Sequence, residues 1–160
     1  MLQICDDFGT QTAPFLSTRS FRELVMPAYK RGLDWIHQHT RWKVLLHSDG
    51  AIFPLLPSII EMGVDILNPV QTTATGMDPR RLKAEFGDRL SFWGGSCDCQ
   101  HTLPRGTPEQ VAAEVRAHLD ALQQRFSANR IDYSVLDTSQ PLDHALYRYL
   151  SRRSRMMKSR

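Results

Sequence analysis

Four short apolar segments of this chain each end in residues that can bind a ligand or move a proton. Imidazole, carboxylate and thiolate groups are common metal ligands and acid–base groups, and amides hydrogen-bond polar substrates. The expected catalytic residues are Asp6, Asp7, His47 and Asp49. The expected substrate-binding residues are Gln11, Asn68, Gln71, Asp98 and Gln100. The first candidate metal ligands are His47 and Asp49, with Cys97 as a third.

The elements that must position these residues alternate between short apolar runs and helical patterns. The expected strands are 2–5, 43–46, 64–67 and 90–93. The expected helices are 20–39 with Ser20 as N-cap and a bend or restart at Pro27, 55–62 ended by Gly63, 79–86 capped by Asp78, and one from Pro108 with a Thr107/Gln110 capping box. Each strand is thus followed by a helix.

This order predicts an α/β fold of four successive βα units with parallel strands. Because the polar residues follow the strands, the architecture favours a partial (β/α)8 barrel, whose functional groups gather at that end of the strands. An open flavodoxin-like sheet is the alternative, because four strands cannot close a barrel. Adjacent strand residues face opposite sides, so only one of Asp6 and Asp7 is expected in the cleft, while the other caps a helix or pairs with a basic residue.

Composition excludes several classes of protein. The 160 residues are 41% hydrophobic and 23% charged, which suits one globular domain with a sizeable core. No stretch approaches the roughly 18 apolar residues of a membrane span, and Met1 opens on a strand-like segment rather than a signal peptide. We therefore expect a cytoplasmic protein that does not enter a membrane.

The three cysteines, an odd number, do not form a disulfide framework. Cys5 lies within an expected strand and is interpreted as a small buried side chain. Cys97 and Cys99 have a C-x-C spacing, unlike the C-x2-C spacing of structural zinc sites, but they can supply one thiolate to a mixed site.

Three longer segments resemble a known family. They are DDFGTQTAPFLSTRSFRELVMPAYKR (6–31), HSDGAIFPLLPSIIEMGVDILNPVQ (47–71) and LKAEFGDRLSFWGGSCDCQHTLPRGTPEQVAAEV (82–115). Their order and spacing resemble the C-terminal half of the uroporphyrinogen decarboxylase superfamily. The motifs HSDG (47–50) and NPVQ (68–71) are more similar to the corrinoid-linked branch of this superfamily, which resembles methylcobalamin:coenzyme M methyltransferase.

The resemblance implies a (β/α)8 barrel and a zinc ion that lowers the pKa of a substrate thiol for attack on a methyl group carried by a corrinoid protein. Such enzymes hold the zinc by His-x-Cys and a distant Cys. Here His47 matches the histidine, but Asp49 stands at the Cys position. Two interpretations of Asp49 remain. It binds the metal, or it orients His47 or caps the next helix.

Relative to the family, the chain begins about halfway through the barrel, and no family pattern follows residue 126. We expect a half-barrel domain over 1–126 and a divergent, basic, disordered tail over 127–160, the product of truncation or of a frameshift near residue 126. Residues 147–160 carry six basic residues and no acid, but no nucleic-acid motif accompanies them, so nucleic-acid binding is not expected.

The leading hypothesis is a fragment of a corrinoid-linked methyltransferase that acts on a small molecule. One alternative is decarboxylation of a porphyrinogen, which needs cationic residues, and only Arg19 and Arg105 lie near the expected strand ends. Another is a non-catalytic half-barrel that binds a complementary barrel half. Whether the chain is an active enzyme by itself is open at this point.

Overall fold

A computed structural model describes residues 1–95, 97–129, 141, 143–144, 147 and 149–151. The chain forms two units, one over Met1–Val115 and the other from Arg116 onward, and the sheet belongs to the first. The sequence predicts a domain boundary after residue 126. Most of the expected tail, 127–160, lies outside the described residues. None of the described helices is long and apolar enough to cross a lipid bilayer.

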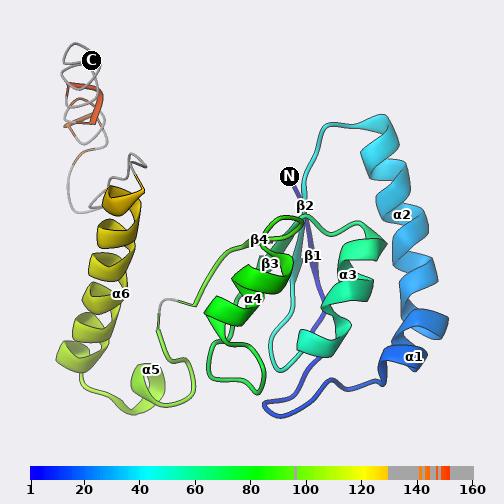
Figure 1. Cartoon of the computed structure of the whole chain (residues 1–160), viewed down its shortest axis with the longest axis horizontal. Helices are drawn as coiled ribbons and strands as arrows, with labels where there is room; N and C mark the ends of the chain where they lie inside the picture. The colour runs from blue at the N-terminus through cyan, green and yellow to red at the C-terminus, as the bar shows by residue number, and fades with distance from the viewer. Residues whose placement is uncertain (96, 130–140, 142, 145–146, 148, 152–160) are drawn as a thin grey trace. The chain divides into compact units, whose positions relative to one another are not determined.

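Four parallel strands form one sheet in the order β1-β2-β3-β4 (Figure 1). The strands are β1 (Leu2–Cys5), β2 (Val44–His47), β3 (Ile66–Asn68) and β4 (Ser91–Phe92). Each strand pairs with the next one along the chain, as in a (β/α)8 barrel, whereas a flavodoxin-like sheet would reverse its order partway. The expected α/β fold of a partial barrel is confirmed.

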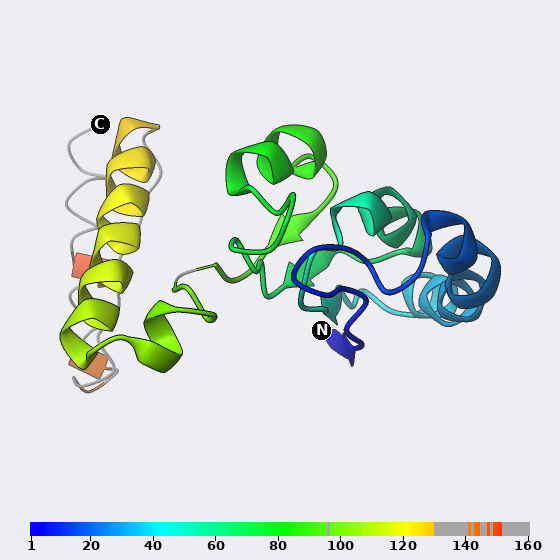
Figure 2. The same ribbon diagram turned by 90° about the horizontal axis from the view of Figure 1, so that it is seen from below.

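Helices follow each of the four strands. They are α1 (Thr18–Ser20), the π-helical turn η1 (Phe21–Val25), α2 (Met26–His39), the 3-10 turn η2 (Phe53–Leu55), α3 (Leu56–Met62), α4 (Pro79–Phe86), α5 (Thr102–Arg105) and α6 (Pro108–Ala128). Figure 2 shows α2, α3 and α4 on one side of the sheet. All three crossovers therefore have the same hand, as parallel strands require.

The start of the first helical segment differs from the prediction. Ser17, rather than Ser20, is the N-cap, and its hydroxyl accepts a hydrogen bond of 3.0 Å from the Ser20 backbone N–H. The helix then widens into η1 and restarts as α2 at Met26. The expected restart at Pro27 is confirmed, because Pro27 has no N–H to donate to the preceding turn.

The other predicted helix boundaries agree with the structure. The Asp78 side chain accepts a hydrogen bond from the Arg81 N–H at 2.8 Å and caps α4. Gly63 ends α3 with a left-handed φ of 107°. At the start of α6, Thr107 and Gln110 exchange reciprocal backbone–side-chain bonds of 2.8 and 3.3 Å, which is the predicted capping box.

The sheet separates a core face from a face that carries the candidate site. Ile4, Leu46 and Leu67 lie in register across three strands and pack into the hydrophobic core with the helices. One residue further along, Cys5, His47 and Asn68 also lie in register and face the opposite side. The prediction that Cys5 is buried is wrong: it is exposed, because the strand alternation turns it away from the helices.

Candidate functional site

The carboxyl ends of β1, β2 and β3 meet at one edge of the sheet. The backbone ladder continues past the strands, since the Asp6 N–H donates to the His47 carbonyl at 3.0 Å and the Ser48 N–H donates to the Asn68 carbonyl at 2.7 Å. These bonds hold the three loops in register where their polar side chains begin. Most of the candidates at these strand ends are therefore brought together, and Asp6, on the other side of β1, is the exception.

Among the described residues, Asp7, His47 and Asp49 form a group that could hold a metal ion. Each offers a ligand atom, and the three atoms lie within 4.8 Å of one another. His47 Nε2 is 3.7 Å from Asp49 Oδ2, and the Asp49 N–H donates to Asp7 Oδ1 at 2.9 Å. Asp7 is exposed, and the other two are half-buried. One nitrogen and two carboxylate groups suit a divalent cation such as Zn²⁺.

Asn68 holds the ring of His47 from the side opposite Asp49. Its Nδ2 donates to the carbonyl of Trp93, at the end of β4, at 2.9 Å. Its Oδ1 lies 2.9 Å from His47 Nδ1. Asn68 thus joins the tips of β2, β3 and β4.

Asp6 and Asp7 face opposite sides, as strand alternation predicts. Asp6 accepts a hydrogen bond from the hydroxyl of Tyr29 in α2, so its carboxylate lies on the helix side of β1. Burial, together with the bond and the charge of Asp6, raises the pKa of Tyr29 to about 12. The sequence predicts that the aspartate outside the cleft caps a helix or pairs with a basic residue. That aspartate is Asp6, and its partner is instead the phenol of Tyr29.

Gln11 and Gln71 use their amides to tie the loops together. Gln71 is buried, with its Oε1 accepting from the Gly50 N–H at 2.9 Å and its Nε2 donating to Gln11 Oε1 at 2.8 Å. These bonds cross from the β3 loop to the loops after β1 and β2. The loops after β1 and β2 also touch at Gly9 and Gly50, whose backbones pack against each other. The contact is so close that a Cβ on Gly50 would lie 2.4 Å from the Gly9 backbone.

The candidates after β4 bond within their own segment and to α6. Asp98 accepts bonds from the Gln100 and His101 N–H groups at 2.8 and 3.1 Å and from His101 Nδ1 at 3.0 Å, and these bonds lower its pKa. Burial and the nearby Glu114 carboxylate raise the pKa of Cys97, which disfavours the thiolate. Among the described residues, neither Cys97 nor Asp98 belongs to the group around His47.

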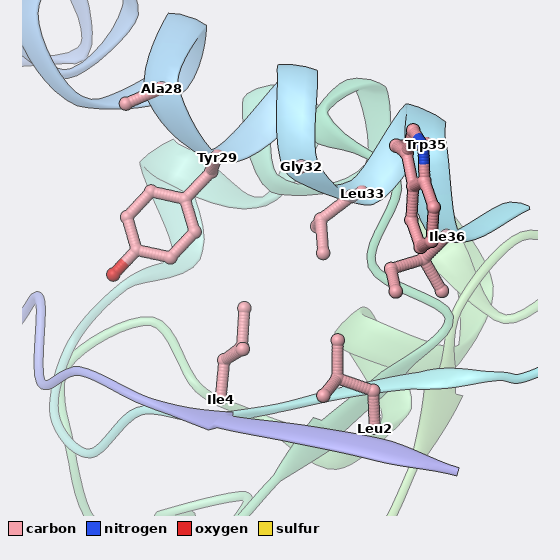
Figure 3. Close-up of a pocket in the computed structure, with 8 residues that line it drawn as sticks. All are labelled: Leu2, Ile4, Ala28, Tyr29, Gly32, Leu33, Trp35 and Ile36. Atoms are coloured by element: carbon pink, nitrogen blue, oxygen red, sulfur yellow. The ribbon is translucent and has the colours of Figure 1, made fainter.

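One cavity among the described residues lies away from this group. It has a volume of about 570 Å³ and lies between β1 and α2, where Leu2 and Ile4 rise from the strand toward Tyr29, Leu33 and Ile36 of the helix (Figure 3). Its lining is apolar, and it is on the helix side of β1, opposite His47. We therefore place the candidate site at the strand tips rather than in this cavity.

Sequence reasoning missed two residues that lie beside candidate residues, one on each side of β1. Cys5 shares the face of His47, which the period of two in β1 could have revealed. Tyr29 reaches Asp6 from 23 residues away, and its place in an amphipathic helix gave no sign of this contact.

Comparison with known proteins agrees with this fold. The family model for uroporphyrinogen decarboxylase (URO-D) matches residues 1–130, which is most of the chain and includes all four strands. The searches of curated proteins and of solved structures found no match to this chain. The chain belongs to the uroporphyrinogen decarboxylase (URO-D) family.

Proposed function

We propose that this chain carries the metal-binding part of a corrinoid-linked methyltransferase of the URO-D superfamily, with Asp7, His47 and Asp49 as ligands of a zinc ion. The observation that supports this most directly is the convergence of three ligand atoms within 4.8 Å at the carboxyl ends of adjacent parallel strands. This is where (β/α)8 enzymes place their reacting groups. The expected partners are a corrinoid protein, which carries the methyl group, and a small thiol acceptor.

The residues have the chemistry that such a metal needs. Bound zinc would lower the pKa of an acceptor thiol, so that the thiol is present as a thiolate near neutral pH. Such a thiolate would be the nucleophile for the methyl group of the corrinoid, which would leave as the cob(I) form with the electron pair of the cobalt–carbon bond. In this proposal Asp7 and Asp49 supply hard oxygen ligands in place of the thiolates of related sites, with a fourth position left for the thiol.

The electrostatics of the site favour this reaction over porphyrinogen decarboxylation. A porphyrinogen carries several carboxylates, which need cationic partners. The group contains two aspartates, and in the described part of the chain neither forms an ion pair with a lysine or arginine. Arg19, one of the two arginines expected to help, pairs with Glu23 at 2.8 Å. Two carboxylates would repel the acidic substrate and attract a cation.

Zinc binding by the purified full chain tests the ligand set. We expect one zinc per chain by isothermal titration, and a loss of at least about tenfold in affinity for Asp49→Asn, Asp7→Asn and His47→Gln. The matched control, Asp98→Asn, removes a carboxylate at the β4 tip and should leave zinc affinity unchanged. Binding lost with Cys97→Ser but kept in Asp7→Asn would refute this ligand set.

Methyl transfer is tested separately with free methylcobalamin and a small thiol. We expect zinc-dependent loss of the methylcobalamin absorption and formation of one thioether per cobalamin, and we expect both to disappear in Asp49→Asn. Zinc binding without thioether formation, even when a cognate corrinoid protein is added, would argue against methyl transfer while leaving the metal site intact.

A further inference from the structure

Asn68 is held in a single orientation by the end of β4. A carbonyl oxygen can only accept a hydrogen bond, so the atom of Asn68 that lies 2.9 Å from the Trp93 carbonyl must be the amide nitrogen. The amide oxygen therefore faces His47. Because Asn68 and His47 are register partners in adjacent strands, the backbone holds the two side chains next to each other.

This orientation determines where His47 carries its proton. The amide oxygen of Asn68 accepts and cannot donate, so the His47 Nδ1 atom 2.9 Å away must bear the hydrogen. A neutral imidazole has only one N–H, and its other nitrogen then has a free lone pair. In His47 that nitrogen is Nε2, which lies 3.7 Å from Asp49 Oδ2 within the group that includes Asp7.

We propose that Asn68 is a positioning residue that fixes His47 as the Nδ1–H tautomer, so that the Nε2 lone pair faces Asp7 and Asp49. In this proposal Asn68 acts on the histidine, and its expected role in substrate binding stays a prediction. An acceptor that bonds a ligand histidine without touching the metal orients the ring and raises its basicity. The use of the lone pair rests on the proposed zinc site, but the tautomer itself does not.

The tautomer can be measured in the metal-free protein. In a 15N-labelled full chain, long-range 1H–15N correlation spectra separate a protonated ring nitrogen from one with a lone pair, and His47→Gln identifies the signals. At a pH where the ring is neutral, we expect the proton on Nδ1 in the wild type. A proton on Nε2 of the wild-type ring would overturn the proposal without any further variant.

Two substitutions then test the role of Asn68. Asn68→Leu removes the acceptor, so the Nε2–H form should gain population and zinc affinity should fall about 10- to 100-fold. Asn68→Asp keeps an acceptor and should retain the Nδ1–H form. The control Asn129→Leu removes an amide that donates to the Arg125 carbonyl at the end of α6, and it should change neither measurement.

The outcomes separate this proposal from the proposed function. An unchanged tautomer in Asn68→Leu would refute the role of Asn68, even if zinc binds. An Nδ1–H tautomer in a protein that binds no zinc would support the positioning role and refute the metal site.

Discussion

The tips of β1, β2 and β3 differ from the segment after β4 in where their polar side chains find partners. At the first three tips, His47 bonds Asn68 on the next strand, and Gln71 bonds Gln11 some 60 residues away. After β4, Asp98 bonds Gln100 and His101, two and three residues along. The first region is a junction of several loops, whereas the second is a turn that bonds within its own segment and, through the Asp98 N–H, to Glu114 of the helix that follows it.

Strand register explains this difference. The ladder continues from β1 to β3 beyond the strands themselves, so side chains at equal height on neighbouring strands face each other. After β4, Gly94 and Gly95 both adopt positive φ, 131° and 82°, and turn the chain sharply. Residues that follow this turn are no longer held to the register of the sheet. Proximity to a strand in sequence is therefore a weaker guide than continuity of the ladder.

The largest expected effect comes from breaking the contact between the β1 and β2 loops. Gly50 has a φ of 90°, and a Cβ there would lie 2.4 Å from the Gly9 backbone. We expect Gly50→Ala to lower the free energy of unfolding by about 3 kcal/mol, because both the conformation and the space forbid a side chain. The measurement is urea unfolding followed by circular dichroism.

Gly32→Ala is the matched control for this prediction. Gly32 lies within α2, and nothing lies within 4 Å of the position of its Cβ. This change should raise stability by about 0.5–1 kcal/mol, because alanine favours the helix. If the two substitutions had equal effects, the loop contact would not be what holds the junction.

A smaller effect is expected for the buried amide that links three loops. Gln71→Leu leaves the Gly50 N–H and the Gln11 amide oxygen without their partner, which should cost about 1–3 kcal/mol. Gln100→Leu, at an exposed position after β4, should change stability by less than about 0.5 kcal/mol. Equal midpoints in urea for both variants would remove the distinction between the two regions.

The smallest effect concerns the outer side of the β1 tip and depends on pH. The pKa of Tyr29 is raised to about 12, so its contribution to stability is complete below the ordinary phenol value of about 10 and is lost as the pH rises toward 12. Tyr29→Phe should therefore cost about 0.5–1 kcal/mol at neutral pH. This difference from the wild type should shrink above about pH 10.

Ultraviolet absorption provides a direct check on Tyr29. The difference between the alkaline titrations of the wild type and Tyr29→Phe isolates this phenol, and its midpoint should lie near 12. A midpoint near 10 would show that burial and Asp6 together do not hold the phenol in its protonated form.

Much of the fold could be predicted from local sequence signals. The four strands, their parallel order, the end of α3, both ends of α4 and the start of α6 follow from apolar periodicity and capping residues. The errors lie where two local signals compete. Ser17 and Ser20 are both good N-caps, and the choice between them depends on how the chain leaves the β1 loop. Cys5 was assigned to the core on residue type, although its neighbours Leu2 and Ile4 already define the buried face.

The candidate site was predictable only in outline. A histidine and carboxylates at strand ends could be read from the chain, and so could the opposite orientation of Asp6 and Asp7. The grouping of Asp7 with His47 and Asp49, rather than of Cys97 with them, could not. It depends on which loops remain in register beyond the strands, and no spacing within a single segment encodes that.

The amino-acid sequence by itself determined the elements of this protein, their order and the edge of the sheet at which its polar residues lie. These properties depend on interactions between residues a few positions apart, such as caps, turns and alternating side chains. Only the tertiary structure decided which polar groups became partners, namely Asn68 with His47, Tyr29 with Asp6 and Gln71 with Gln11. Those choices are made between residues more than 20 positions apart, because backbone register and close packing set the distances between their side chains.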